Sequence, residues 1–338
     1  MLEEILEEYK AERVLLIGVG GGGDIVSTIH LYNRLRLFDV DRFIGSIPWE
    51  RYVVDPAPGP ISPLDLRGSI VISCNTHLAI PTTMACRAGL CFYIQASKVS
   101  RNLGIPVLLS FIDKGVKGLV ESLYNAVAFF DIDLVVGVDA GGDILAEGFE
   151  ENLASPLADQ VGLAGLAELE RKYGVRTLVA VHGLGCDGEI PVDTLLRRLS
   201  FLAEKGAVLG FEGITRWDID LVLEALRGVD TEASRMPLEA FRGRYGLVRI
   251  RRGTREVFLN MLSAVTVFLD ASLLYRYSRL ARMLAGTASI EEARQKLNAI
   301  GIYTELDLEH DLVATKMYDV VELRRRGKEK LLSMLSKD

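Results

Sequence analysis

Short apolar runs alternate with amphipathic stretches over the first two thirds of the chain, and this alternation predicts repeated strand–helix units on a parallel sheet. The first run, residues 13–19, reads RVLLIGV and leads into a run of glycines. Because these runs are apolar at consecutive positions, we expect helices to cover both faces of the sheet. The predicted strands span residues 13–19, 42–47, 69–73, 106–111, 133–138 and 177–181, with a last short strand at 207–209.

Helical periodicity fills the segments between these strands. An opening helix places Leu2, Ile5, Leu6 and Tyr9 on one face, and a second helix begins at Asp24. Further helices are predicted near residues 92–103, 114–130, 156–172 and 192–205, the third of them with Ser155 as its N-cap and Pro156 at its first position.

The alternation stops after Glu212, and helical patterns dominate the remainder. Residues 247–250 and 256–259 predict a β-hairpin, and the other predicted elements are helices near 217–226, 260–285 and 289–300 and a charged terminal helix. The basic cluster of that last helix, Arg324–Arg326 with Lys328 and Lys330, is expected to be a solvated face. We therefore predict an α/β protein. It would comprise an open, mostly parallel Rossmann-like sheet domain over residues 1–212 and an α-rich C-terminal domain or appendage over residues 213–338.

Three of the predicted strands end in turns made of glycine and carboxylate residues. The turns read GVGGGGD from residue 18, GVDAGGD from residue 137 and HGLGCDGE from residue 182. Because the carboxyl ends of parallel strands lie at one edge of an open sheet, we expect the three turns to meet there. The carboxylates that would converge are those of Asp24, Asp139, Asp143, Asp187 and Glu189.

Carboxylates crowded in this way repel one another unless a cation lies between them or one of them holds a proton. Mg²⁺ and Mn²⁺ choose oxygen ligands, so we expect such an ion to be held or oriented by Asp24, Asp139, Asp143 and Asp187. His182 or Glu189 would then transfer a proton. A purely structural interpretation stays open for each turn, in which the carboxylates cap helices or close Asx turns.

Further residues near this edge are candidates for contacting a phosphorylated or nucleotide-like ligand. The glycine run would let backbone N–H groups approach an anion. Trp49 and Arg51 precede a proline-rich loop that would either close over a substrate or be anchored in place. Asn75 and Lys114 follow the third and fourth predicted strands, and Lys114 would either contact phosphate or be a solvated lysine at a helix start. The glycines are Gly20, Gly21, Gly22 and Gly23.

The glycines at positions 18, 20 and 23 also match the dinucleotide-binding fingerprint. Two features oppose that interpretation: no acidic residue stands about 20 positions further on at the end of the second strand, and Asp24 places negative charge where a pyrophosphate would approach. An NAD(P)- or flavin-dependent oxidoreductase is therefore the second hypothesis, and a non-catalytic ligand-binding or assembly protein is the third.

Composition narrows the set of partners. The 338 residues carry a net charge of −7, which argues against nucleic acid. No apolar stretch is long enough to span a membrane, and the acidic start of the chain is unlike a secretory signal, so we expect a cytoplasmic protein.

Residues 1–212 hold 18 Lys and Arg against 28 Asp and Glu, whereas residues 213–338 hold 21 against 18. A basic second part facing an acidic first part would suit a small anionic metabolite, although solvated helix faces explain the same numbers.

The cysteines and the oligomeric state add little to the prediction of function. Cys74, Cys86, Cys91 and Cys186 form no CxxC motif, so we expect buried reduced thiols rather than a zinc site, with a disulfide left open as an alternative. A homo-oligomer is compatible with the sequence, which carries no signal for or against one.

Five separated segments resemble an archaeal family named domain of unknown function 1152. They read GGGGDIVS, WERYVVDPAPGP, VGVDAGGDIL, ASPLAD and GIYTELD and extend over nearly the whole chain. The resemblance implies one folded unit rather than a fusion, and no established activity. It also implies that the following are family features: Gly20–Gly23, Asp24, Trp49, Glu50, Arg51, Asp139, Gly141, Gly142, Asp143, Ser155, Pro156 and Asp159.

Together, these features predict an enzyme that depends on Mg²⁺ or Mn²⁺ and acts on a phosphorylated or nucleotide-like small metabolite.

Overall fold

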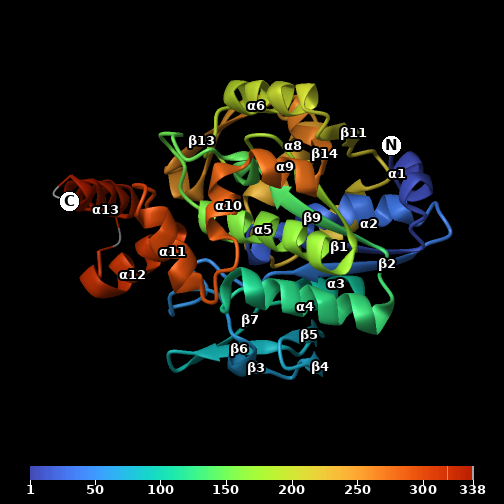
Figure 1. Cartoon of the computed structure of the whole chain (residues 1–338), viewed down its shortest axis with the longest axis horizontal. Helices are drawn as coiled ribbons and strands as arrows, with labels where there is room; N and C mark the ends of the chain where they lie inside the picture. Colours follow the sequence, from blue (N-terminus) through green and yellow to red (C-terminus); the bar gives the residue numbers. More distant parts are fainter. Residues whose placement is uncertain (318, 337–338) are drawn as a thin grey trace.

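A large central sheet organises the computed structural model, which describes residues 1–317 and 319–336 (Figure 1). Within these residues the sheet has nine strands in the order β11-β14-β10-β9-β1-β2-β8-β5-β4. Its five middle strands are parallel: β10 (Arg176–His182), β9 (Leu134–Ala140), β1 (Arg13–Gly18), β2 (Asp41–Ser46) and β8 (Val107–Ser110). The prediction of an α/β fold with a large, mostly parallel sheet is confirmed.

The middle strands are buried because alternate residues enter cores on opposite faces of the sheet. In β1, Leu15 and Ile17 belong to one hydrophobic cluster, whereas Val14 and Leu16 belong to another. Their continuous apolar sequence therefore reflects two covered faces, as expected of a parallel sheet.

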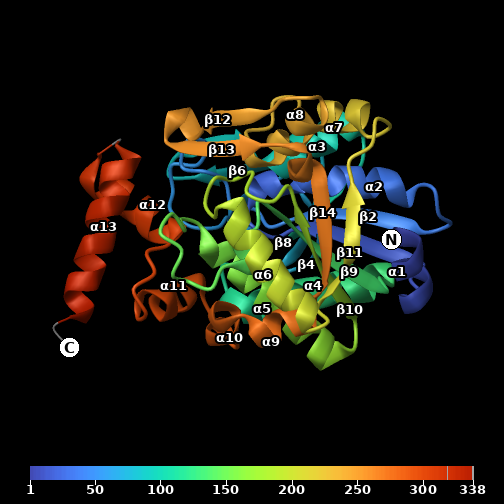
Figure 2. The same ribbon diagram turned by 90° about the horizontal axis from the view of Figure 1, so that it is seen from above.

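Helices form the two outer layers (Figure 2). Residues of α4, α5, α6, α9, α10 and α11 share the core with Leu15, while α1, α2, α3 and α7 cover the opposite face. On the first face, the bounds are α4 (Gly115–Phe130), α5 (Pro156–Tyr173), α6 (Val192–Glu204), α9 (Ala271–Tyr277), α10 (Arg279–Leu284) and α11 (Ile290–Asn298). On the second, they are α1 (Leu2–Tyr9), α2 (Ile29–Leu35), α3 (Gln95–Leu103) and α7 (Ile219–Ala225).

One end of the sheet is antiparallel. The strand predicted at residues 69–73 is β4 (Ile70–Ser73), but it lies at the edge and pairs antiparallel with β5 (Thr76–Ala79). Its exposed Ile70 and Val71 show that an apolar run need not be a buried parallel strand. The last predicted strand is β11 (Val208–Gly213), at the opposite edge.

The helix predicted over residues 260–285 is wrong at its start, because residues 265–270 form β14 (Val265–Asp270). A short apolar run rich in β-branched residues cannot be assigned to helix or strand by periodicity alone. Here β14 inserts between β10 and β11 and is antiparallel to both. Residues on either side of position 212 therefore contribute to one sheet.

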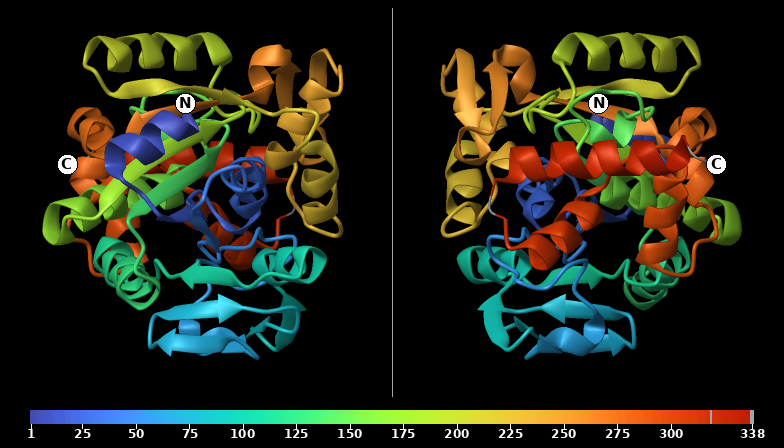
Figure 3. Two further views of the ribbon diagram at one scale, coloured as in Figure 1. Left: turned by 90° about the vertical axis from the view of Figure 1, so that its right-hand side faces the viewer. Right: turned by 90° about the vertical axis from the view of Figure 1, so that its left-hand side faces the viewer.

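The remaining C-terminal elements cover the end of the sheet at which its parallel strands finish. β12 (Gly246–Ile250) and β13 (Arg255–Leu259) pair antiparallel and pack on α8 (Met236–Phe241). Figure 3 shows α13 (Val320–Leu335) crossing this end of the molecule beside α12 (Glu305–Thr315). Short 3-10 helices complete the chain: η1 (Gly22–Thr28), η2 (Pro63–Asp65), η3 (Asp143–Leu145), η4 (Ala233–Arg235), η5 (Arg251–Gly253) and η6 (Met261–Ala264).

A small separate sheet contains a disulfide. Its strands are β3 (Leu66–Arg67), β6 (Met84–Arg87) and β7 (Leu90–Tyr93), and the Cys86–Cys91 bond joins directly paired residues of β6 and β7. The expectation of reduced thiols is wrong for these two residues, because the tight turn between β6 and β7 places them opposite each other. Cys186 is a buried free thiol, and Cys74 is free but exposed.

Among the described helices, none is both long and apolar enough to cross a bilayer.

The placement of β14 inside the sheet predicts a large effect of truncating Phe268, whose side chain is fully buried. We expect Phe268→Ala to lower the free energy of unfolding by about 3 kcal/mol or more. Phe211→Ala, on the neighbouring β11, is the control because Phe211 is 60% exposed, and it should cost less than about 1 kcal/mol. Urea denaturation measures both values, and equal effects would contradict the placement.

Candidate metal centre

Six carboxylates gather at the ends of β1, β9 and β10, and we call this group the acidic centre. It comprises two sets, Asp24 with Asp139 and Asp159, and Asp143 with Asp187 and Glu189. In each set, one carboxylate oxygen from every residue lies within 4.8 Å of the others. The five carboxylates expected to converge therefore do so, joined by Asp159.

The register of the parallel strands explains the convergence. Gly18 at the end of β1 pairs with Val138, and Val181 in β10 pairs with Asp139. The turns that follow are also tied together, since Gly141 N–H donates to His182 O at 3.0 Å and Gly185 N–H to Gly141 O at 2.7 Å. Three turns far apart in sequence are thus fixed at one edge.

Two glycines leave the space that the carboxylates occupy. A Cβ atom on Gly20 would lie 2.6 Å from Asp24 Oδ2 and 2.7 Å from Asp159 Oδ1. A Cβ atom on Gly141, where φ is +119°, would lie 2.4 Å from Asp187 Cγ. Gly20 N–H also donates to Asp24 Oδ2 at 3.0 Å. The glycine-rich turns therefore allow backbone and carboxylates to pack closely.

The start of α5 supplies the residue that sequence reasoning missed at this edge. Pro156 is the first residue of α5, as predicted, and Asp159 lies in its first turn. Ser155 precedes the helix but its side chain does not cap it; the Glu305 carboxylate accepts from Leu157 N–H at 3.1 Å and Ala158 N–H at 2.9 Å instead. The pattern of strand ends does not predict Asp159, because Asp159 lies in a helix. Only the family resemblance indicates this residue.

Several oxygens of the acidic centre are buried without a hydrogen-bond donor among the described residues. They are both carboxylate oxygens of Asp139, one of Asp159 and one of Asp187. Burial raises the pKa of Asp24 and of Asp187 to about 7. Burial, with Asp24 and Asp187 nearby, also raises the pKa of Asp139 well above its usual range. A group of carboxylates in this state requires protons or a cation.

Glu189 differs from its neighbours because all its charge is compensated. Arg255 Nη1 lies 2.8 Å from its carboxylate, the N–H groups of Ala154 and Ser155 donate to it at 2.7 and 2.8 Å, and the Ser155 hydroxyl donates as well. Burial opposes ionisation, but Arg255 and Ser155 outweigh it and lower the pKa of Glu189 to about 2. Glu189, expected to transfer a proton, is therefore placed as an ionised anchor between the β10 turn and α5.

His182, Asn75 and Lys114 do not line the cavities beside the acidic centre. His182 is buried, bonds through Nδ1 to Thr266 Oγ1 at 2.8 Å and stacks on His30 with ring centroids 4.1 Å apart. Burial holds its pKa well below the usual value. Its side chain joins β10 to β14. The sequence does not predict this contact, because its pattern favours a helix over residues 265–270.

The other two residues are separated from the acidic centre by the strand order. Asn75 lies in the turn between the antiparallel strands β4 and β5, where its Oδ1 accepts from Asn125 Nδ2 at 2.9 Å. Lys114 is exposed at the start of α4, after β8. Since β2 lies between β8 and β1, neither residue belongs to the three adjacent strand ends.

Two connected cavities open beside the acidic centre. The smaller, about 80 Å³, is lined by the acidic centre without Asp139 and by Gly20, Gly21, Gly22 and Gly23. The larger, about 770 Å³, shares with it Trp49, Arg51, Ser155 and Arg251. Trp49 and Arg51, which the sequence predicts to contact a substrate, therefore line both cavities.

Trp49 and the proline-rich loop are held there by α12. Trp49 Nε1–H donates to Glu309 at 3.1 Å, and Gly59 N–H donates to the same carboxylate at 2.7 Å. Burial raises the pKa of Glu309 to about 8. The proline-rich loop is thus anchored to α12 through Glu309, which itself lines the larger cavity.

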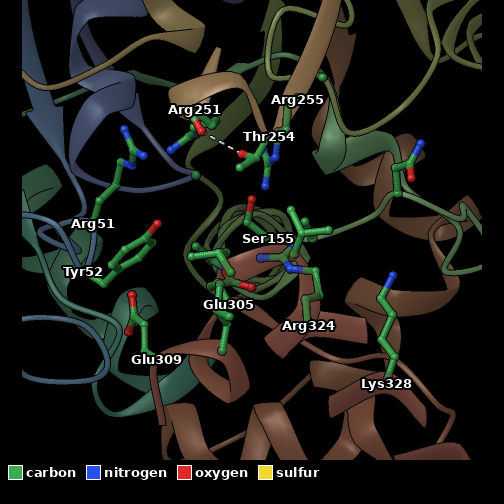
Figure 4. A pocket seen from close by; sticks show the side chains of 18 of the residues that line it. Arg51, Tyr52, Ser155, Arg251, Thr254, Arg255, Glu305, Glu309, Arg324 and Lys328 are labelled. Atoms are coloured by element: carbon green, nitrogen blue, oxygen red, sulfur yellow. Dashed lines mark hydrogen bonds between the residues drawn. The ribbon is translucent and has the colours of Figure 1, made fainter. Parts of the chain in front are cut away.

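Basic side chains from the C-terminal part line the larger cavity (Figure 4). Arg251 and Arg255 come from the β12–β13 turn and strand, and Arg324 and Lys328 come from α13. The expected solvated face holds for Arg326, which is 59% exposed, but is wrong for Arg324 and Lys328. Acidic residues of the first part of the chain and basic residues of the second therefore line two cavities that share part of their lining.

The Glu189–Arg255 pair yields a stability prediction. We expect Arg255→Gln to lower the free energy of unfolding by about 3 kcal/mol, because it leaves a buried carboxylate without its cation. Arg249→Gln is the control, since Arg249 pairs with Glu256 while 75% exposed and should contribute less than about 1 kcal/mol. Urea denaturation measures both. The double variant Arg255→Gln/Glu189→Gln should recover part of the loss, and a purely additive double variant would argue against the pairing.

Comparison with known proteins places the chain in a family. No curated protein matches it. A family model described as "Protein of unknown function (DUF1152)" matches residues 15–313, a range that contains the whole acidic centre and ends before Arg324. The matched range is well over half of the chain, and the protein belongs to the DUF1152 family.

Proposed function

We propose that the protein is an enzyme that depends on a divalent metal ion, Mg²⁺ or Mn²⁺, and acts on a phosphorylated or nucleotide-like small metabolite. The observation that carries this proposal is the set of buried carboxylate oxygens of Asp139, Asp159 and Asp187 that have no hydrogen-bond donor among the described residues, beside a large cavity lined by several arginines. Leaving them uncompensated would cost several kcal/mol for each ion. Oxygen-only donor sets of this kind suit hard divalent cations.

The residues that would hold the metal follow from the same observation. Asp139 is the central candidate because neither of its oxygens has a hydrogen-bond donor in the described part of the chain, with Asp24 and Asp159 in the same set. Asp143 and Asp187 are candidates from the second set. When bound, the ion would neutralise these carboxylates and polarise a phosphoryl oxygen or a water molecule.

Other residues of the chain would prepare the site and bind the substrate. Gly20 allows Asp24 and Asp159 to approach each other, and Glu189 fixes Ser155 and Arg255 at the border between the cavities. Trp49, Arg51 and the arginines of the C-terminal part would contact the substrate and offset its charge. The position of His182 gives it a structural role here.

The geometry gives less support to a nicotinamide- or flavin-dependent oxidoreductase. Gly20 N–H and Gly22 N–H, which the fingerprint would aim at a pyrophosphate, donate to Asp24 and to Trp49 O. A non-catalytic ligand-binding protein would use the same cavities, and differs from the proposal only in lacking turnover.

The proposal predicts metal binding that depends on Asp139. Calorimetric titration with Mn²⁺ and with Mg²⁺ should give saturable heats for the wild type. Asp139→Asn should weaken binding at least about tenfold, because it removes charge and one ligand oxygen while keeping the side-chain shape. Asp39→Asn, at an exposed position outside the centre, is the control and should bind as the wild type does.

A melting experiment controls for an effect of the Asp139→Asn substitution on folding. Because the amide relieves repulsion in the metal-free centre, Asp139→Asn should melt no lower than the wild type in EDTA. Equal heats in Asp139→Asn and the wild type would refute the metal site. A metal-binding wild type that turns over no phosphorylated metabolite in a substrate panel would support the non-catalytic alternative.

A further inference from the structure

Two guanidinium groups of the larger cavity lack the partners that their neighbours have. Arg255 is paired with Glu189, and Arg51 lies 3.5 Å from Glu232. Among the described residues, by contrast, no carboxylate lies within 4.0 Å of the guanidinium of Arg251 or of Arg324. Arg251 Nε is also buried without a hydrogen-bond acceptor there.

These two arginines come from opposite walls of the cavity (Figure 4). Arg251 lies in the turn between β12 and β13, where its N–H donates to Glu232 at 2.9 Å and its carbonyl accepts from Thr254 Oγ1 at 2.7 Å. Arg324 projects from α13 toward Ser155. Hydrogen bonds of its main-chain N–H and carbonyl therefore fix the position of Arg251, and its side chain lines the cavity.

The two groups raise the positive potential of this part of the cavity. Burial, with Arg255 and Arg51 nearby, lowers the pKa of Arg251 to about 10. Burial and Arg255 also lower the pKa of Arg324. Arg255 is thus a positive neighbour of both guanidinium groups, and an anion bound by Arg251 and Arg324 would offset this repulsion.

We propose that Arg251 and Arg324 form an anion subsite for a phosphate group other than the one at the metal, so that the substrate carries a diphosphate. This inference rests on the proposed function, since it deepens the substrate class of the same site. Guanidinium groups bind phosphate oxygens in a bidentate manner, and their fixed planes favour phosphate over other anions.

The arrangement of the two cavities favours a substrate with more than one phosphoryl group. The smaller cavity has room for an ion and very few water molecules, so the substrate must lie in the larger one. Arg251 lines both cavities, whereas Arg324 lines only the larger. An anion that contacts the acidic centre through the metal, and then Arg251 and Arg324, extends from one cavity into the other, and a diphosphate is longer than a single phosphate.

The rest of the larger cavity accommodates an organic group. Tyr52, Leu308, Val320 and Val321 line it together with Trp49. A volume of about 770 Å³ lies within the range of cavities that bind metabolites. The substrate class is therefore an organic diphosphate rather than inorganic pyrophosphate itself, although pyrophosphate contains the recognised group.

The test is a titration with pyrophosphate, given as its preformed magnesium complex and, separately, as free pyrophosphate in EDTA. We expect magnesium pyrophosphate to bind the wild type and Arg324→Gln to weaken binding roughly tenfold or more, because charged hydrogen bonds are lost. Arg251→Gln provides a second variant with the same expected direction. The matched control is Arg326→Gln on the same helix, where Arg326 is exposed and paired with Glu322, and it should bind as the wild type does.

The outcomes separate this inference from the proposed function. Equal binding of pyrophosphate by the wild type and Arg324→Gln overturns the subsite, and orthophosphate binding as tightly as pyrophosphate overturns the diphosphate. If Mn²⁺ binds through Asp139 but pyrophosphate does not bind, the inference fails and the metal site stands. If free pyrophosphate binds in EDTA through Arg324 while no metal binds, the subsite stands and the metal proposal fails.

Discussion

Six carboxylates are held together against their mutual repulsion where β1, β9 and β10 end. The neighbouring elements concentrate this charge rather than disperse it. Gly20 and Gly141 carry no side chain that would separate the carboxylates, and Glu189 receives donors on both its oxygens. Among residues 1–317 and 319–336, neither oxygen of Asp139 has a hydrogen-bond donor. Such an arrangement is unfavourable by itself and would become favourable with a cation bound among the carboxylates.

The C-terminal part of the chain returns to the sheet through β14, and this return places its basic residues beside the acidic centre. Because β14 lies between β10 and β11, the segment before it, with β12, β13 and Arg255, is fixed beside the β10 turn. Arg255 Nη1 donates to Asp187 O at 3.1 Å as well as pairing with Glu189. The unequal charge of the two parts of the sequence thus becomes a separation of charge across one cavity.

The parallel strands and the convergence of their turns could be predicted, because both follow from local apolar runs and from one topological rule. β14 could not, since a short apolar run between helices has no periodicity that distinguishes strand from helix. Asn75 was misplaced for a related reason: the apolar run before it is an exposed antiparallel edge strand. Asp159 and Arg324 reach the site from helices, whose direction in space depends on tertiary packing that no local pattern contains.

The two halves of the site compensate each other's charge. A divalent ion alone would compensate the charge of the acidic centre but would leave Arg251 and Arg324 without a counter-ion. An anion alone would satisfy the arginines but face the carboxylates that line the adjoining cavity. Under the proposed assignment, metal and diphosphate each remove a repulsion that opposes the other, so their binding free energies are coupled, and by linkage the coupling is the same in both directions. Under that assignment, the crowding of like charge in each cavity would be the physical basis for binding metal and substrate as one unit.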